Sequence, residues 1–91
     1  MAYLNQTRNV NDNWSINEYR CQAYRELQID VYCSDFRLTV NVSLFDLDRM
    51  PPFRQVDLIA LAEYLWQPGK QVGMSFDIAK QTINYLEVTR G

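Results

Sequence analysis

The sequence contains no histidine, so its 91 residues lack the commonest general base and the commonest metal ligand in proteins. A serine or cysteine nucleophile would have to use a lysine or a carboxylate as its base. Only three glycines are present, and they do not cluster into a loop that could cradle phosphate groups. We therefore expect a protein that is not an enzyme, with no catalytic residue, no bound metal and no cofactor.

Neither sign of charge is in large excess, because the sequence has nine Lys and Arg residues and eleven Asp and Glu residues, for a net charge of −2. A nucleic-acid-binding protein should carry a concentrated basic face, so nucleic acid is an unlikely partner. No stretch approaches the roughly 20 apolar residues of a membrane span, and the N-terminal residues lack the apolar segment that a secretory signal requires. The sequence predicts a cytoplasmic protein without a membrane partner.

The two cysteines, Cys21 and Cys33, stand twelve residues apart in one extended segment. If that segment is straight, the cysteines lie about 40 Å apart, far beyond the reach of a disulfide, although a fold-back would weaken this argument. We expect free thiols, which agrees with a reducing cytoplasm.

Residues 1–13 are polar and rich in asparagine, and we predict a loop or a loosely docked N-terminal arm. Hydrophobic residues make up 47% of the whole sequence, which is enough for one modest core. Residues 14–91 are therefore expected to form a single α+β domain.

From residue 19 to residue 33, apolar side chains occupy nearly all odd positions, and polar or tyrosine side chains occupy the even ones. This period of two predicts a half-buried strand with the odd positions toward the core. Arg25 breaks the pattern and suggests a bulge or bend. A helix over residues 15–26 is the alternative, because Ser15 and Glu18 have the spacing of a capping box. We favour the strand.

The apolar positions switch from odd to even numbers after Ser34 and Asp35, where we predict the turn of a β-hairpin. Such a turn pairs residues whose numbers sum to 69. Val31 then faces Leu38, and every other apolar residue of the two strands falls on the same side. Loop length and hydrophobic pattern agree on this one register.

Residues 54–66 are predicted to form a helix that ends at Pro68 and Gly69 and packs through an apolar stripe, Leu58, Leu61, Ala62 and Leu65. A short strand over residues 72–76 follows. Asp77 is expected to cap a last helix that ends at about residue 88, with its apolar side formed by Ile78, Ala79, Thr82, Ile83, Tyr85 and Leu86. The fold class is α+β, in which a small, mainly antiparallel sheet, an N-terminal β-hairpin meander, has two helices packed on one face.

Two groups of side chains are candidates for binding a partner. The helix over residues 54–66 is apolar on nearly all sides, which points to a second contact surface around Ile59, Glu63 and Trp66, unless the N-terminal arm covers it. On the polar side of the hairpin, tyrosine and arginine form a patch of the kind found at binding hot spots: Tyr24, Tyr32 and Arg37. The alternative for this patch is cross-strand packing that only stabilises the sheet.

Residues 74–87 read Met-Ser-Phe-Asp-Ile-Ala-Lys-Gln-Thr-Ile-Asn-Tyr-Leu-Glu. This segment resembles the end of the BssS family of small bacterial biofilm regulators, which place a comparable Asp-x-Ala-basic-Gln helix after a short strand. Trp14 and Ile16 add a fainter similarity. The resemblance covers about a quarter of the chain, implies a small cytosolic regulator and transfers no site residue.

We therefore expect a small protein-binding regulator or inhibitor that forms a homodimer and is of the antirepressor or anti-defence type that phages and mobile elements encode. The alternative is a small hydrolase that uses carboxylates, or a ligand-binding subunit, either of which requires a deep polar pocket.

Overall fold

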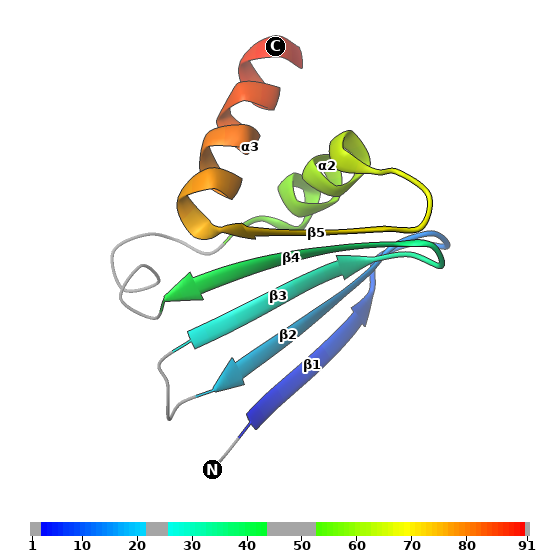
Figure 1. Cartoon of the computed structure of the whole chain (residues 1–91), viewed down its shortest axis with the longest axis vertical. Coiled ribbons are helices and arrows are strands. Elements are labelled where there is room, and N and C mark those ends of the chain that lie inside the picture. The colour runs from blue at the N-terminus through cyan, green and yellow to red at the C-terminus, as the bar shows by residue number, and fades with distance from the viewer. Residues whose placement is uncertain (1–2, 22–25, 44–52, 91) are drawn as a thin grey trace.

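Five strands form one sheet in a computed structural model that describes residues 3–21, 26–43 and 53–90. The first four strands are an antiparallel meander, and the last strand runs parallel to its neighbour at the sheet edge (Figure 1). This arrangement confirms the predicted α+β class. The described elements are β1 (Tyr3–Asn9), β2 (Ser15–Cys21), β3 (Glu26–Tyr32), β4 (Phe36–Ser43), α2 (Gln55–Leu65), β5 (Lys70–Ser75) and α3 (Phe76–Arg90).

The hairpin of β3 and β4 has the predicted register at every paired position. Val31 faces Leu38, Tyr32 faces Arg37, and all other partners also sum to 69. The amide of Cys33 donates to the carbonyl of Phe36 at 3.0 Å, which leaves Ser34 and Asp35 as the two-residue turn. Loop length and apolar pattern were sufficient to fix this part of the fold.

Strand β2 confirms the strand interpretation of residues 15–21 against the helix, but its predicted facing is wrong. The long alternating segment is two antiparallel strands, and Ser15 pairs with Tyr32 across them. Four residues separate the paired ends Cys21 and Glu26. Because this number is even, each odd-numbered residue of β2 pairs with an even-numbered residue of β3. Even positions of β2 therefore share the helix side with the odd positions of β3, and Ile16 is fully buried.

The cysteines lie at opposite ends of this strand pair. Cys21 pairs with Glu26, so Cys33 lies seven positions further along β3, about 23 Å away. The segment does fold back, and the expected 40 Å was too long, but the remaining separation still exceeds the reach of a disulfide. Cys33 is a free thiol. Cys21 pairs with Glu26 in the backbone register, and its predicted place on the core face stays a prediction.

The predicted N-terminal arm is in part a strand, because residues 3–9 form β1 and pair along their whole length with β2. A tight loop joins the two strands, and the side chain of Asn11 accepts hydrogen bonds from the amides of Asn13 and Trp14, each at 2.8 Å. Strand β1 has no apolar alternation, so the pattern that identifies half-buried strands could not detect it. It lies at the sheet edge and does not cover α2 (Figure 1).

Helix α2 packs against the sheet through Leu58, Leu61 and Ala62, as predicted. Gly69 forms the turn after it with a positive φ of 73°, and its amide donates to the Asp35 carbonyl at 2.7 Å. Arg54, which precedes the helix, is held by carboxylates on both helices: Asp57 at 2.9 Å and Glu87 at 3.2 Å. The hydrogen bond to Asp57 raises the pKa of Arg54 above its usual value, with a smaller contribution from Glu87.

Helix α3 buries only part of the apolar side that was predicted for it. Its inward stripe is Phe76, Ala79, Ile83 and Leu86, whereas Ile78 and Tyr85 are exposed. Both stripes recur at helical spacing, so the sequence pattern alone could not choose between them. The Ser75 hydroxyl accepts the amide of Ile78 at 3.4 Å, which makes Ser75 the capping side chain in place of Asp77.

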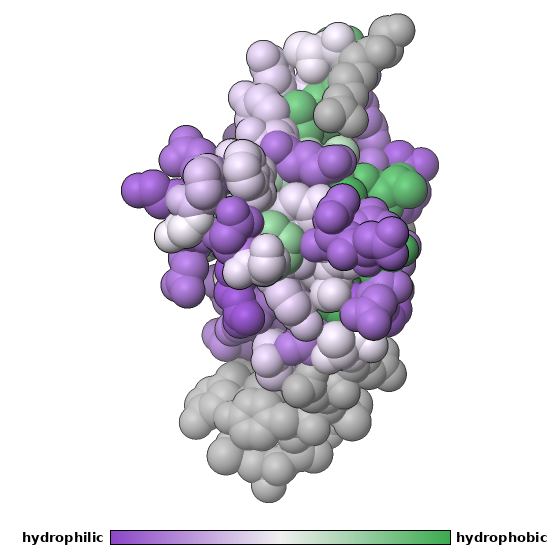
Figure 2. Space-filling view, turned by 90° about the vertical axis from the view of Figure 1, so that its right-hand side faces the viewer, coloured by the Kyte–Doolittle hydropathy of each residue, from purple (hydrophilic) through white to green (hydrophobic). Residues whose placement is uncertain are grey.

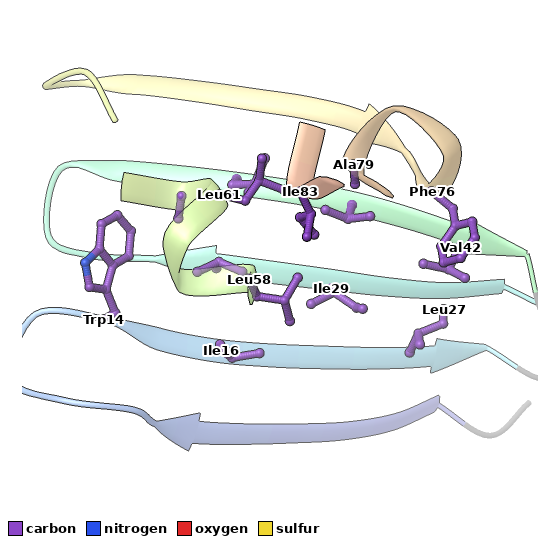
Figure 3. Packing of buried hydrophobic residues seen from close by; sticks show 14 of the residues in the cluster. Trp14, Ile16, Leu27, Ile29, Val42, Leu58, Leu61, Phe76, Ala79 and Ile83 are labelled. Atoms are coloured by element: carbon purple, nitrogen blue, oxygen red, sulfur yellow. The ribbon is translucent and has the colours of Figure 1, made fainter. Parts of the chain in front are cut away.

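The core lies between the helices and one face of the sheet. Figure 3 shows Leu58 over Ile29 and Phe76 over Val42, within one cluster of buried side chains. Trp14 closes one end of this cluster, with its ring edge-on to Phe36 at a centroid distance of 6.1 Å. Of the described elements, none lies over the opposite face of the sheet, which we call the open face (Figure 1).

The facing of β2 can be tested with Ile16→Ala. Loss of this fully buried side chain should lower the free energy of unfolding by about 2–5 kcal/mol. Val56→Ala, at a position of α2 that is 65% exposed, should change it by about 0.5 kcal/mol or less. Urea denaturation measures both, and similar losses in the two variants would show that the position of Ile16 is wrong.

Candidate functional site

The open face is built from cross-strand rows that the strand register aligns. Each of three rows crosses all five strands, one residue from each. The central row is Thr7, Asn17, Asp30, Thr39 and Gly73. The rows on either side of it are Asn9, Ser15, Tyr32, Arg37 and Gln71, and Asn5, Tyr19, Gln28, Asn41 and Ser75.

Asp30 is the centre of a polar network in these rows, although its residue is only 1% exposed. Its carboxylate accepts hydrogen bonds from the Thr39 hydroxyl at 2.9 Å, the Arg37 guanidinium at 3.1 Å and the Gln28 amide at 3.2 Å. A buried carboxylate needs such partners, because leaving it unpaired is very costly. The network therefore fixes the positions of three side chains on the open face.

Arg37 is held from two directions. Its guanidinium bonds to Asp30 and also lies over the Tyr32 ring, with its central carbon 5.1 Å from the ring centroid. The Arg37 side chain remains 46% exposed, so it is both fixed and accessible. A side chain that is already ordered loses little conformational entropy when a partner binds, which favours Arg37 and Tyr32 as contact residues.

The network continues toward β1 through a second buried polar residue. The Thr7 hydroxyl donates to the side-chain oxygen of buried Asn17 at 2.8 Å, and the Ser15 hydroxyl donates to Asn9 at 3.0 Å. None of the described buried side chains lacks a hydrogen-bond partner. The buried polar side chains of the open face are therefore all hydrogen-bonded.

The composition of the open face suits protein recognition. Its three rows consist of Tyr, Asn, Ser, Thr, Gln and Gly, apart from Arg37 and Asp30, which neutralise each other. Tyrosine with small polar residues is the composition of antibody paratopes, and charged residues other than arginine are depleted from interfaces. Five strands of about seven residues make a face of about 24 by 23 Å, which is somewhat smaller than the roughly 800 Å² that each partner buries in an interface of standard size.

A hollow of about 650 Å³ adjoins this face beside Tyr32. It lies between the connection of β1 to β2 and the end of β3, and its lining includes the amides of Asn9, Asn11 and Asn13. Amide groups both donate and accept hydrogen bonds, so the hollow offers polar contacts next to the half-buried Tyr32 ring.

The second candidate surface is a pocket of about 490 Å³ at the end of the molecule where the connecting loops meet. Asp12, Asp35 and Glu63 line it together with the Trp66 ring. One oxygen of Asp35 accepts from the Trp66 indole at 3.2 Å and from the Cys33 thiol at 3.3 Å. Figure 2, which views this end, shows a mostly hydrophilic surface. Among the described residues, no group of His, Cys, Asp or Glu could hold a metal ion.

The predicted partner-binding residues are divided between these two surfaces. Tyr32 and Arg37 touch each other on the open face, whereas Glu63 and Trp66 line the pocket at the loop end. Ile59 is half-buried and packs against the core, so only part of its side chain is accessible, and its role as a contact stays a prediction. Tyr24 lies outside the residues that the structure describes.

The prediction from sequence missed the buried polar residues beneath this patch, Asp30 and Asn17. Asp30 could have been found, because the hairpin register already placed it opposite Thr39 and next to Arg37. Asn17 could not, because its facing depends on the connection between β2 and β3.

No family model, no curated protein and no solved structure matches this chain significantly. The resemblance of residues 74–87 to the BssS family therefore stays a prediction. None of the described helices is both long and apolar enough to cross a membrane.

The network around Asp30 can be tested with Thr39→Val, which removes one hydroxyl donor with little change of shape. We expect the free energy of unfolding to fall by about 1–3 kcal/mol, because the buried carboxylate loses a partner. Ser34→Ala is the control, since it removes an exposed hydroxyl from the turn of the same hairpin. Equal effects of the two variants in chemical denaturation would contradict the role assigned to Asp30.

Proposed function

We propose that the chain is a non-enzymatic protein-binding regulator or inhibitor that recognises its partner through the open face. The observation that carries this proposal is the fixed, exposed Arg37, held by buried Asp30 and by the Tyr32 ring. Arginine and tyrosine dominate the binding energy of many protein interfaces, particularly where their surroundings hold them in place.

The neutral charge of the open face supports a protein partner. A nucleic-acid-binding sheet needs cations arrayed toward phosphates, and the three rows contain only Arg37, which is already paired with Asp30. The free thiol of Cys33 supports a reducing, cytoplasmic setting. A factor of the antirepressor or anti-defence kind, encoded by a phage or mobile element, is the biological role that we propose for such a surface.

The pocket at the loop end supports a second candidate function, a ligand-binding or carboxylate-based hydrolytic site. Three carboxylates and an indole ring around one pocket are the supporting observation. The two candidates require different surfaces, so substitutions can separate them.

Affinity capture with the tagged full chain, from a lysate of its native source, tests the protein-binding function. Tyr32→Ala together with Arg37→Lys should weaken binding of the captured partner by at least about 30-fold, the effect of losing one hot spot of about 2 kcal/mol. Lysine keeps a cation beside Asp30 but lacks the planar group that stacks on an aromatic ring.

Val56→Ala is the control, because Val56 is exposed on α2, away from both surfaces. Binding that survives the open-face variant but is lost on Glu63→Gln with Trp66→Ala would reject the open face in favour of the loop-end pocket. Circular dichroism of each variant establishes that it is folded.

A further inference from the structure

Helix α3 carries a second stripe of side chains that faces away from the core. Ile78, Thr82, Tyr85 and Thr89 follow one another at intervals of four, three and four residues, which places them on one side of the helix. Ile78 is 54% exposed and Tyr85 is 55% exposed. We call these four residues the outer stripe. Alternating spacings of three and four are those of the seam between two packed helices.

The outer stripe is more apolar than its sequence suggests. The Thr82 hydroxyl donates to the Ile78 carbonyl at 2.9 Å, and the Thr89 hydroxyl donates to the Tyr85 carbonyl at 3.0 Å. Both hydroxyls are thus satisfied within the helix, as polar groups must be when a surface is to be buried. The two threonines present mainly their methyl groups to the outside.

Charged side chains are absent from the positions flanking the outer stripe in the described helix. Gln81 and Val88 lie beside it, and Val88 is 81% exposed. Lys80, which approaches the Phe76 ring, and Glu87, which bonds to Arg54, lie on the other side of the helix, and Asp77 lies in the first turn, beyond Gln81. A helix face without charge that is also this exposed is unusual for a surface in contact with water.

We infer that the outer stripe packs, in antiparallel orientation, against the outer stripe of a second copy of this chain. In the symmetric register, Ile78 faces Thr89 of the other copy and Tyr85 faces its Thr82. Each large side chain then meets a small one, so that the two stripes interdigitate. A parallel pair would set tyrosine against tyrosine and threonine against threonine. The stripe is therefore complementary to itself in one orientation.

The area available agrees with this occupant. Tyr64 of α2 lies against Tyr85, with a ring-centroid distance of 6.4 Å, and extends the apolar surface of the stripe. The combined apolar surface is about 400 Å² of exposed side chain per copy, contributed by Tyr64, Ile78, Tyr85, Val88 and the threonine methyl groups. A dimer interface of standard size buries about 800 Å² per partner, of which about 60% is apolar. The stripe supplies nearly that apolar share.

Sedimentation velocity of the full chain over a wide concentration range tests the pairing. We expect a reversible dimer, and Tyr85→Lys should raise its dissociation constant at least about 30-fold. Asn84→Lys is the matched control, because it adds the same charge to the neighbouring exposed position on another side of the helix. It should change the dissociation constant about twofold or less. A wild-type chain that stays monomeric throughout overturns the proposal, whether another part of the chain or a different protein covers the stripe.

Orientation is tested by mixing two variants. Thr82→Glu and Tyr85→Lys should each be weakened alone, but the antiparallel register sets the new glutamate against the new lysine. The mixture should therefore form a heterodimer more readily than either variant pairs with itself. A wild-type dimer without this rescue rejects the antiparallel seam. Neither result depends on partner capture through the open face, so this proposal and the proposed function can fail separately.

Discussion

The two-residue turn at Ser34 and Asp35 determines what each face of the sheet becomes. It pairs positions whose numbers sum to 69, which puts Val31 opposite Leu38 on the helix side and Asp30 opposite Thr39 on the open face. A slip of one residue would send every apolar side chain of one strand into water. The core and the polar network are therefore two consequences of the same register, and neither could change without the other.

Asp30 shows how an open sheet face can contain a nearly buried charge. Three donors surround its carboxylate, and one of them, Arg37, remains half in solvent, so the pair is only partly removed from water. A partly solvated arginine avoids most of the desolvation cost that makes a fully buried ion pair unfavourable. The arrangement fixes Arg37 more firmly than an exposed ion pair would, because the fully buried partner has little freedom to move.

The sequence was sufficient where loop length and apolar pattern agreed, and insufficient where only one of them was present. The β3–β4 hairpin had both. In β2 the alternation was visible, but the four-residue connection that reverses its facing was not, so Tyr19 was assigned to the core side although it pairs with Gln28 on the open face. Strand β1 has no alternation because it is an edge strand of mostly polar residues. On α3 two stripes fit helical periodicity equally well, and only packing against the sheet chooses Ile83 over Tyr85.

The two α3 stripes also link the proposed dimer to the proposed function. Because α3 and the open face lie on opposite sides of the sheet, a dimer joined through the outer stripes leaves both open faces free. Each dimer then presents two identical sites, and a partner that is itself dimeric binds the second site intramolecularly. Overall affinity can then exceed that of one face by a factor of about 10²–10⁴ without any new contact. A small face with one strong contact centre at Arg37 and Tyr32 gains most from such pairing, since its own area limits the affinity of a single site.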